Sequence, residues 1–175
     1  MKLGRPPTHL ILLVEDNAGD VELVTTITQR LQPGVAFNIA RDGVEAIAML
    51  QKCKMQRNLP DLVLLDLNLP NKCGRDVIRE VKQDEMLMSV PIIVLTSSNS
   101  PEDVNAAYAL GANGYVTKGM DYIATRDKLD TLLKFWLQIA QLTERPVRHW
   151  PHENSVQEPM PFSDTRNWAD YELEF

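Results

Sequence analysis

The sequence predicts an α/β fold: a doubly wound, five-stranded parallel sheet with helices on both faces, followed by a C-terminal extension. Five short apolar runs typical of strands occur between residues 8 and 117. A segment with the 3.6-residue period of an amphipathic helix follows each run. This alternation favours parallel strands, because each connection between strands must pass through a helix that covers one face of the sheet.

The predicted strands are short and rich in aliphatic residues. The first is a continuous apolar run, as expected for a strand that is covered on both faces. Turn residues or helical segments separate each strand from the next. The five strands are residues 8–14, 35–40, 61–65, 91–95 and 114–117.

The predicted helices lie between and after these strands. The fourth has clear signals at both ends: Ser100 suits the N-cap, Pro101 the first helical position, and Asp103 stands at the spacing of a capping box. It ends before Gly111, where glycine suits a left-handed cap. The five helices are residues 18–31, 43–55, 74–83, 101–110 and 125–142.

Composition excludes several classes of protein. Hydrophobic residues make up 44% and charged residues 24% of the chain, as in globular rather than disordered proteins. A net charge of −6 argues against binding to nucleic acid, which needs a dense Lys/Arg surface. The apolar runs are too short to span a membrane, and the N-terminus lacks the pattern of a signal peptide. Cys53 and Cys73 lack metal-ligand spacing and fit free thiols, so we expect a cytoplasmic protein.

The composition changes near residue 143, which divides the chain into a domain of residues 1–142 and an extension of residues 143–175. The extension contains four prolines and five of the eleven aromatic residues. A solvated linker would be poor in aromatic residues, so we expect an arm that packs on another surface. A disordered acidic tail is the alternative. The aromatic residues are Trp150, Phe162, Trp168, Tyr171 and Phe175.

Polar residues follow four of the predicted strands, and the carboxyl ends of such strands meet at one edge of a doubly wound sheet. Three carboxylates there would repel one another without a cation, and oxygen ligands without His or Cys suit Mg²⁺. A carboxylate beside Mg²⁺ can attack a phosphoryl group, whose oxygens lysine and threonine can bind. A glycine-rich ATP-binding loop is absent from the sequence. The polar segments are Glu15-Asp16-Asn17, Asp66-Leu67-Asn68, Thr96-Ser97 and Thr117-Lys118.

In these segments the chain resembles the receiver domains of two-component response regulators. The resemblance covers about residues 8–140 and implies a CheY-like, flavodoxin-type fold with strand order 2-1-3-4-5. It depends on motifs that occur in order at the expected strand ends. They are LLVEDN at 12–17, LVLLDLNLPNKCG at 62–74, PIIVLTSS at 91–98 and GYVTK at 114–118.

The resemblance implies that Asp66 is the phosphoacceptor and that Mg²⁺ is bound beside it. Asp16 would bind the metal directly, and Glu15 would assist through a water molecule. Asp66 itself and the backbone carbonyl of Asn68 would be further ligands. The structural alternative is that Asp16 and Asn17 only cap the first helix.

Three further residues match phosphoryl-binding and switch positions of the family. Lys118 would pair with the carboxylate of Asp66 and then with the phosphoryl group. Thr96 would donate a hydrogen bond to a phosphoryl oxygen and move toward it. Tyr115 matches the switch aromatic, whose rotamer is coupled to the threonine; simple packing in the core is the alternative for this side chain.

The chain departs from the usual pattern after the fifth strand. Most receivers have Lys-Pro there, joined by a cis peptide, whereas Lys118 is followed by Gly119. A cis bond without proline is unfavourable, so we expect a trans bond and a reshaped loop. Lys72-Cys73-Gly74 also replaces the usual Met-Asp-Gly segment. Neither departure removes the phosphoacceptor.

These features narrow the resemblance to the stand-alone response regulators that are paired with cyanobacterial phytochromes and bacteriophytochromes. The Lys-Gly pair, the LDLNLP segment and a final helix ending in FWLQIAQL carry this narrower resemblance. It implies a sensor histidine kinase, a bacteriophytochrome, as the phosphoryl donor. It also implies a regulator that has no DNA-binding output domain and forms homodimers.

The final predicted helix indicates dimerisation independently of the family. Its apolar residues fill an arc of about 220° on a helical wheel, roughly twice what packing on one sheet face needs. We therefore expect a two-fold symmetric dimer through the final helix and the fifth strand, with residues 143–175 crossing onto the partner. An extension that folds back on its own subunit is the alternative. The apolar arc comprises Leu129, Leu132, Leu133, Phe135, Trp136, Leu137, Ile139, Ala140 and Leu142.

The leading hypothesis is a phosphorylation-dependent switch, not an enzyme that acts on an external metabolite. An intermediate phosphoryl carrier in a phosphorelay has the same sequence signature and stays open as the alternative. A phosphoaspartate hydrolase of the haloacid-dehalogenase kind would need a second Asp two residues after Asp66, where the chain has Asn68. The complete set of polar residues at the strand ends argues against a receiver-like scaffold without phosphoryl chemistry.

Overall fold

Five parallel strands form one sheet in the order β2-β1-β3-β4-β5, as expected. The computed structural model describes residues 8–142. The predicted arm, residues 143–175, lies outside the described residues. The strands are β1 (His9–Val14), β2 (Val35–Ala40), β3 (Leu62–Leu65), β4 (Ile92–Thr96) and β5 (Gly114–Thr117).

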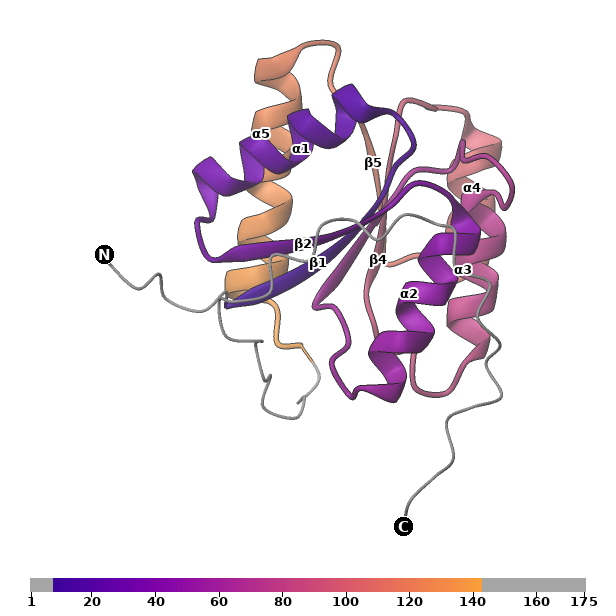
Figure 1. Ribbon diagram of the computed structural model, residues 1–175. Helices are drawn as coiled ribbons and strands as arrows, with labels where there is room; N and C mark the ends of the chain where they lie inside the picture. The colour runs from indigo at the N-terminus through magenta and orange to yellow at the C-terminus, as the bar shows by residue number, and fades with distance from the viewer. Residues whose placement is uncertain (1–7, 143–175) are drawn as a thin grey trace.

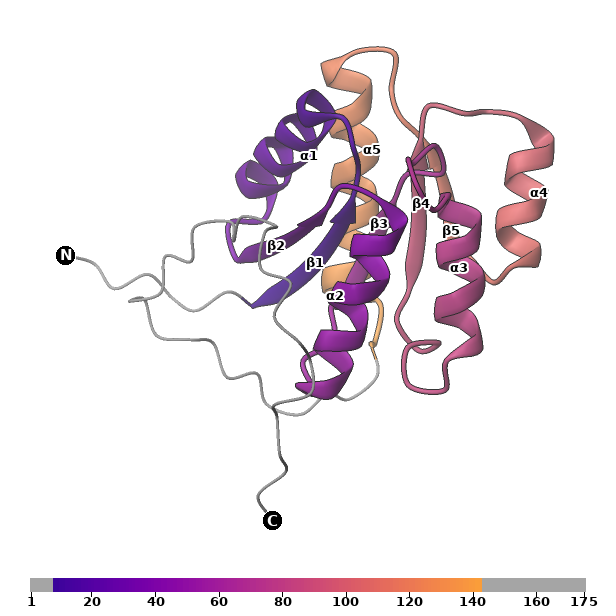
Figure 2. The same ribbon diagram turned by 45° about the vertical axis from the view of Figure 1, so that its right-hand side comes forward.

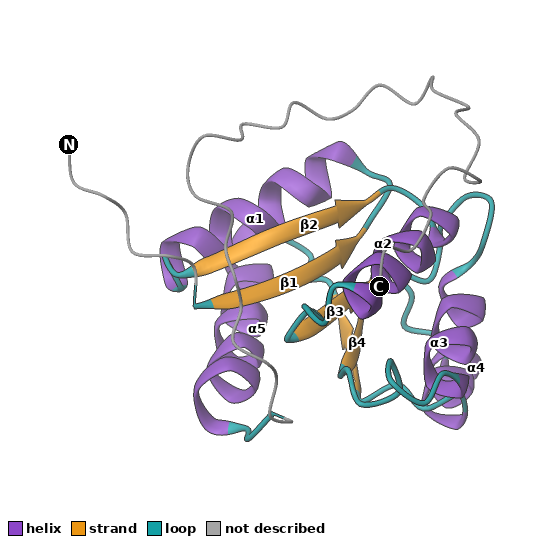
Figure 3. Ribbon diagram, turned by 60° about the horizontal axis from the view of Figure 1, so that its bottom comes forward, coloured by secondary structure: helices purple, strands orange, loops and turns teal. Residues whose placement is uncertain are grey.

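Helices cover both faces of the sheet. Helices α1 and α5 lie together on one face, and α2, α3 and α4 lie on the other (Figures 1 and 2). Figure 3 shows β1 and β2 running side by side in the same direction between these two layers. Across the described residues, none of the helices is long and apolar enough to cross a membrane. The helices are α1 (Ala18–Leu31), α2 (Gly43–Met55), α3 (Gly74–Gln83), α4 (Pro101–Ala109) and α5 (Tyr122–Lys134), followed by a π-helical turn, η1 (Phe135–Ile139).

The core consists of two apolar clusters, one on each side of the sheet. Successive residues of a strand point to opposite faces, so alternate residues of β1 belong to different clusters. Leu12 and Val14 pack with residues of α2 and α3, whereas Ile11 and Leu13 pack with residues of α1 and α5. This burial on both sides explains why β1 is a continuous apolar run.

The strand register brings the polar strand ends to one edge. Val14 is aligned with Leu65 of β3, and Thr96 of β4 is aligned with Thr117 of β5. The ladder extends one residue further, because the backbone N–H of Asp66 donates to the carbonyl of Val14 at 3.0 Å. The residues that follow these strands therefore lie at nearly the same height along the strand direction, at the carboxyl edge of the sheet.

The start of α4 differs from the predicted capping box. Ser100 is the N-cap, as expected, but its hydroxyl accepts a hydrogen bond from the N–H of Glu102. The carboxylate of Asp103 does not return to the cap; it accepts from the hydroxyl of Ser98 and from the guanidinium of Arg75 on α3. Asp103 therefore pairs with Arg75 of another helix, although the local spacing predicted that it would bond its own helix cap.

Two other local predictions concern helix ends that the structure describes. Asn17 caps α1 by accepting a hydrogen bond from the N–H of Asp20 at 3.1 Å. Gly111 has a φ of +99° after α4, as expected for a left-handed cap. The prediction for Gly111 is confirmed, and Asn17 has the capping role that was its structural alternative.

The last helix begins earlier and ends earlier than the predicted range 125–142. Its first residue is Tyr122, because Asp121 caps the helix by accepting a hydrogen bond from the N–H of Ala124 at 2.8 Å. The regular α-helix ends at Lys134 and is followed by the π-helical turn η1. The N–H of Ala140 then bonds the carbonyl of Phe135, and the chain leaves in an extended conformation.

The predicted apolar arc of this helix divides into a buried and an exposed part. Leu129, Leu133 and Leu137 are buried in the cluster that includes α1. In contrast, Phe135 is 49% exposed and Ile139 is 69% exposed. The arc is therefore wider than the sheet can cover within the described residues, as the wheel indicated.

Candidate functional site

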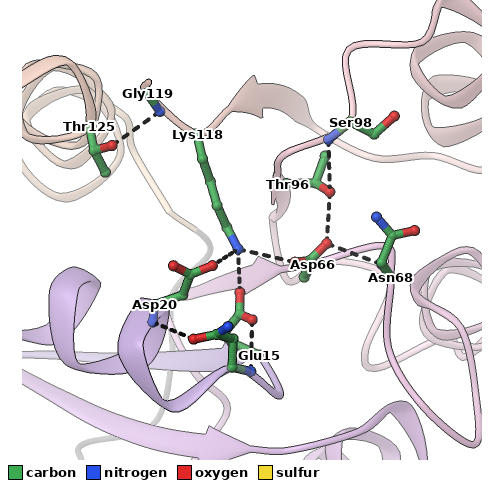
Figure 4. A network of polar contacts seen from close by, with 10 residues as sticks. Glu15, Asp20, Asp66, Asn68, Thr96, Ser98, Lys118, Gly119 and Thr125 are labelled. Atoms are coloured by element: carbon green, nitrogen blue, oxygen red, sulfur yellow. Dashed lines mark hydrogen bonds and ion pairs between the residues drawn. The ribbon is translucent and has the colours of Figure 1, made fainter. Parts of the chain in front are cut away.

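Lys118 is at the centre of the polar groups at the carboxyl edge of the sheet (Figure 4). It follows β5, and its Nζ donates to Glu15 Oε2 at 2.6 Å, to Asp20 Oδ2 at 2.7 Å and to Asp66 Oδ2 at 3.1 Å. Burial lowers the pKa of Lys118, but the hydrogen bonds to Asp20 and Glu15 outweigh burial, so the net shift is upward. The side chain is therefore a fixed cation at neutral pH.

Asp66 follows β3 and is almost completely buried. Its Oδ1 accepts hydrogen bonds from the hydroxyl of Thr96 at 2.7 Å and from the N–H of Asn68 at 3.1 Å. Burial raises the pKa of this carboxyl group, yet these hydrogen bonds and the charge of Lys118 together hold the pKa below its usual value. Asp66 is thus an ionised carboxylate that is held in a fixed orientation.

Glu15 follows β1 and has the opposite electrostatic balance. The pKa of this buried carboxyl group is raised, because desolvation outweighs the hydrogen bond and charge of Lys118. Its Oε1 accepts from the N–H of Asn17 at 3.0 Å. Together with Asp20 and Asp66, Glu15 makes three carboxylates around one ammonium group, a formal charge of −2 that favours binding of a cation.

The structure brings most of the predicted site residues together. Glu15, Asp66, Thr96 and Lys118 form one connected network. Asp16 is exposed and takes no part in the hydrogen bonds that connect these residues.

Asn68 enters the network through its backbone N–H. Within residues 8–142, no group of three His, Cys, Asp or Glu side chains is arranged to hold a metal ion. The carboxylates of Glu15 and Asp66 nevertheless provide the oxygen ligands that Mg²⁺ prefers.

Asp20 is a member of the network that the sequence prediction missed. It lies in the first turn of α1, and its side chain is 37% exposed, whereas that of Glu15 is 4% exposed. Its place in the first turn of the helix gave at most a weak signal, because an acid there ordinarily stabilises the helix start. Its contact with Lys118 joins residues 98 positions apart, which no local pattern reveals.

A chain of hydrogen bonds leads from Asp66 to the fourth helix. The N–H of Ser98 contacts the hydroxyl of Thr96 at 3.4 Å, and the hydroxyl of Ser98 donates to Asp103 Oδ2 at 2.5 Å. The hydroxyl of Tyr115 donates to the carbonyl of Ser98 at 3.0 Å. The predicted switch aromatic is therefore half-buried and attached to the β4–α4 loop rather than to the threonine side chain.

Gly119 connects the lysine to the start of α5. The Lys118–Gly119 peptide is trans, as expected. The N–H of Gly119 donates to Thr125 Oγ1 at 3.1 Å. A Cβ atom at this position would lie 2.4 Å from the backbone N of Thr125 and 2.7 Å from the carbonyl carbon of Ala124. Glycine lets the loop approach the helix closely. Lys118 is therefore held in place by the backbone contact of its neighbour Gly119 as well as by the contacts of its own ammonium group.

Comparison with known proteins gives a consistent set of relatives. A family model described as the response regulator receiver domain matches residues 11–130. The chain is 39% identical over 138 residues to the response regulator Rcp1 of Synechocystis sp. (strain ATCC 27184 / PCC 6803 / Kazusa), covering 78% of this chain and 94% of that protein. It is 34% identical to a probable methanogenesis regulatory protein, FilR2, of Methanothrix harundinacea (strain 6Ac), covering 73% and 83%.

Solved structures with the same fold include two close matches. The phosphorylated cyanobacterial phytochrome response regulator RcpA has a TM-score of 0.73 and 36% identity, covering 78% of this chain and 99% of that one. The Mn(2+)-bound form of response regulator Rcp1 has a TM-score of 0.71 and 38% identity, with the same coverage.

Proposed function

The chain belongs to the response regulator receiver domain family, and on that premise we propose that it is a stand-alone response regulator that accepts a phosphoryl group on Asp66 from a sensor histidine kinase. The observation that carries this proposal is the geometry of Asp66. Its carboxylate is buried, has a lowered pKa, and lies within hydrogen-bond distance of both Thr96 and Lys118. A nucleophile flanked by a hydroxyl and an ammonium group is suited to phosphoryl transfer.

The proposed step moves one phosphoryl group and leaves the overall electron count unchanged. A carboxylate oxygen of Asp66 attacks the phosphorus of a phosphohistidine, the new P–O bond forms, and the P–N bond breaks. The imidazole nitrogen of the kinase keeps the electron pair of the broken bond. Lys118 and Thr96 then bind phosphoryl oxygens, because both groups already donate hydrogen bonds to the carboxylate that becomes the acyl phosphate.

The same site would hold Mg²⁺. Glu15, Asp16, Asp66 and the backbone carbonyl of Asn68 would be its protein ligands, with Glu15 acting through water. When bound, the ion would neutralise the negative charge between the carboxylates and the phosphoryl oxygens. The excess of carboxylates over ammonium groups supports this proposal, as does the solved Mn(2+)-bound form of Rcp1.

The proposed output is a change in protein–protein contacts near α4, β5 and α5. The hydrogen bonds from Asp66 through Thr96 and Ser98 reach Tyr115 on β5 and Asp103 on α4. A phosphoryl group on Asp66 would compete for the hydroxyl of Thr96 and so disturb this chain.

We also propose that the chain works in the cytoplasm as a homodimer. The exposed Phe135 and Ile139 at the end of the last helix support a dimer through this region, with residues 143–175 as an arm. A bacteriophytochrome is the proposed kinase. The phytochrome response regulator RcpA supports this choice because it is among the most similar solved structures.

Intact mass spectrometry tests the central proposal. The wild type and Asp66→Asn are incubated with acetyl phosphate and Mg²⁺, with and without EDTA. We expect one phosphoryl adduct on the wild type only, and none when EDTA is present. An adduct of equal yield on Asp66→Asn, or no adduct on the wild type at any donor concentration, would overturn the assignment of Asp66.

A further inference from the structure

We propose that Asp20 is a positioning residue that competes with Asp66 for the ammonium group of Lys118 and so restrains phosphorylation of Asp66. This inference deepens the proposed function and depends on it. Nζ of Lys118 lies 2.7 Å from Asp20 but 3.1 Å from Asp66. Because an ammonium group has three hydrogens, its contacts with Glu15, Asp20 and Asp66 use its whole donor capacity.

Asp20 differs from the other two carboxylates in its setting. The side chains of Glu15 and Asp66 are 4% and 8% exposed, whereas that of Asp20 is 37% exposed and comes from α1 rather than from a strand end. The two buried carboxylates are held in place by neighbouring backbone N–H groups. Asp20 can therefore be exchanged with little effect on the core, and its substitution tests the restraint without disturbing a buried carboxylate.

A phosphoryl group on Asp66 needs Lys118 as a donor, and two of the three contacts of this ammonium group are with other carboxylates. The new oxygens lie beyond the carboxylate, so Lys118 must give up part of its present coordination to bind them. Loss of the Asp20 charge would weaken one competing acceptor and change the formal charge of the three carboxylates and the ammonium group from −2 to −1. Both changes favour a doubly charged phosphoryl group and a negatively charged phosphodonor.

Asp20→Asn tests this restraint, and Glu22→Gln is its matched control. Glu22 lies on the same helix and is exposed. Its substitution by Gln removes the same charge from a side chain that does not contact Lys118. At saturating Mg²⁺ we expect Asp20→Asn to accept phosphoryl from acetyl phosphate about three- to tenfold faster than wild type and to hold it about three- to tenfold longer. Glu22→Gln should match the wild type, and Asp20→Glu should return toward it because the carboxylate is restored.

A second measurement, the NMR resonance of the Lys118 side-chain nitrogen, reports on the surroundings of this group in the unphosphorylated protein. The ¹⁵Nζ resonance of Lys118, assigned with Lys118→Arg, should shift in Asp20→Asn and not in Glu22→Gln. A phosphoryl lifetime equal to that of wild type, together with an unshifted ¹⁵Nζ resonance in Asp20→Asn, would overturn the proposal. A phosphoryl lifetime shorter than that of wild type would also overturn it. If no variant is phosphorylated, the proposed function fails, while the resonance still decides whether Asp20 positions Lys118.

Discussion

The hydroxyl of Thr96 donates a hydrogen bond to Oδ1 of Asp66 at 2.7 Å, which joins the carboxyl ends of β4 and β3 inside the protein. Thr96 is fully buried and Asp66 nearly so, so water cannot replace the bond. The same hydroxyl lies 3.4 Å from the N–H of Ser98. One hydroxyl group therefore joins the proposed phosphoacceptor, Asp66, to the β4–α4 loop, because it donates to the carboxylate and accepts from the loop N–H.

Removal of this hydroxyl should raise the pKa of Asp66. In Thr96→Val the buried carboxylate loses a hydrogen bond that favours its ionised form, and we expect the free energy of unfolding at pH 7 to fall by about 1–3 kcal/mol. Because the folded pKa of Asp66 lies below its usual value, the stabilisation is present above that value and is lost as the pH falls. The difference between the variant and wild type should shrink in acid.

The measurement is an NMR titration of the Asp66 side-chain carboxyl carbon, combined with urea unfolding. Thr96→Ser keeps the hydroxyl and is the control that should retain a lowered pKa. An Asp66 pKa in Thr96→Val equal to that of wild type would show that the bond has no electrostatic role.

Substitution of Gly119 should displace the start of α5. A Cβ atom would meet the backbone of Ala124 and Thr125 below 3 Å, so Gly119→Ala should lower the free energy of unfolding by about 1–3 kcal/mol. Gly119→Pro should be at least as destabilising, because it also removes the N–H that donates to Thr125.

Thermal unfolding of these two variants and of Gly19→Ala provides the comparison. Near Gly19 an added Cβ would meet only the side chain of Asn17, at 3.2 Å, so this control should unfold close to wild type. An unchanged melting temperature in Gly119→Pro would mean that the chain tolerates the usual Lys-Pro sequence without rearrangement.

Lys82 should stabilise the fold without affecting the site. Its Nζ donates to the carbonyls of Met88 and Val90 before β4, and to Asn113 Oδ1 before β5, at the edge opposite Asp66. Lys82→Met leaves these acceptors without their donor, and we expect a loss of about 1–3 kcal/mol in the free energy of unfolding. The rate of phosphorylation at a temperature where the variant is folded should stay at the wild-type value.

Urea unfolding and the acetyl phosphate assay separate the two effects. Lys52→Met is a matched control, since Lys52 is exposed on α2. A Lys82→Met variant as stable as Lys52→Met would contradict the structural role.

Asp84 should make stability depend on pH in strong acid. The hydrogen bond from Lys54 at 2.7 Å, supported by the N–H groups of Met86 and Leu87, lowers the pKa of Asp84 from 3.8 to about 2. A carboxyl group with a lowered folded pKa contributes stability that is complete above 3.8 and is lost as the pH falls toward 2.

Wild type should therefore exceed Asp84→Asn in urea midpoint at pH 7, and the gap should narrow between pH 4 and pH 2. Glu85→Gln removes a neighbouring charge and is the control. A gap that stays constant over this pH range would show that Asp84 acts through packing rather than through its charge.

Some of the site was predictable because it depends on a topological rule. The four residues stand at the ends of predicted strands, and parallel strands of a doubly wound sheet bring their carboxyl ends together. They are Glu15, Asp66, Thr96 and Lys118. Asp20 was missed because it stands inside a helix, where an exposed acid in the first turn has an ordinary structural role. The resemblance to the receiver family assigned Asp16 to the metal; its side chain is exposed and outside the hydrogen-bond network, and its role as a ligand stays a prediction.

The sequence by itself determined the strands, the first three helices and the meeting of polar strand ends, because these follow from side-chain periodicity within short segments. Only the tertiary structure decided which donors and acceptors pair across the chain. Asp103 bonds Arg75 instead of its own helix cap, and Lys118 binds Asp20 across 98 positions. Competition between such partners depends on distances between separate elements, and the periodicity of one segment carries no information about them.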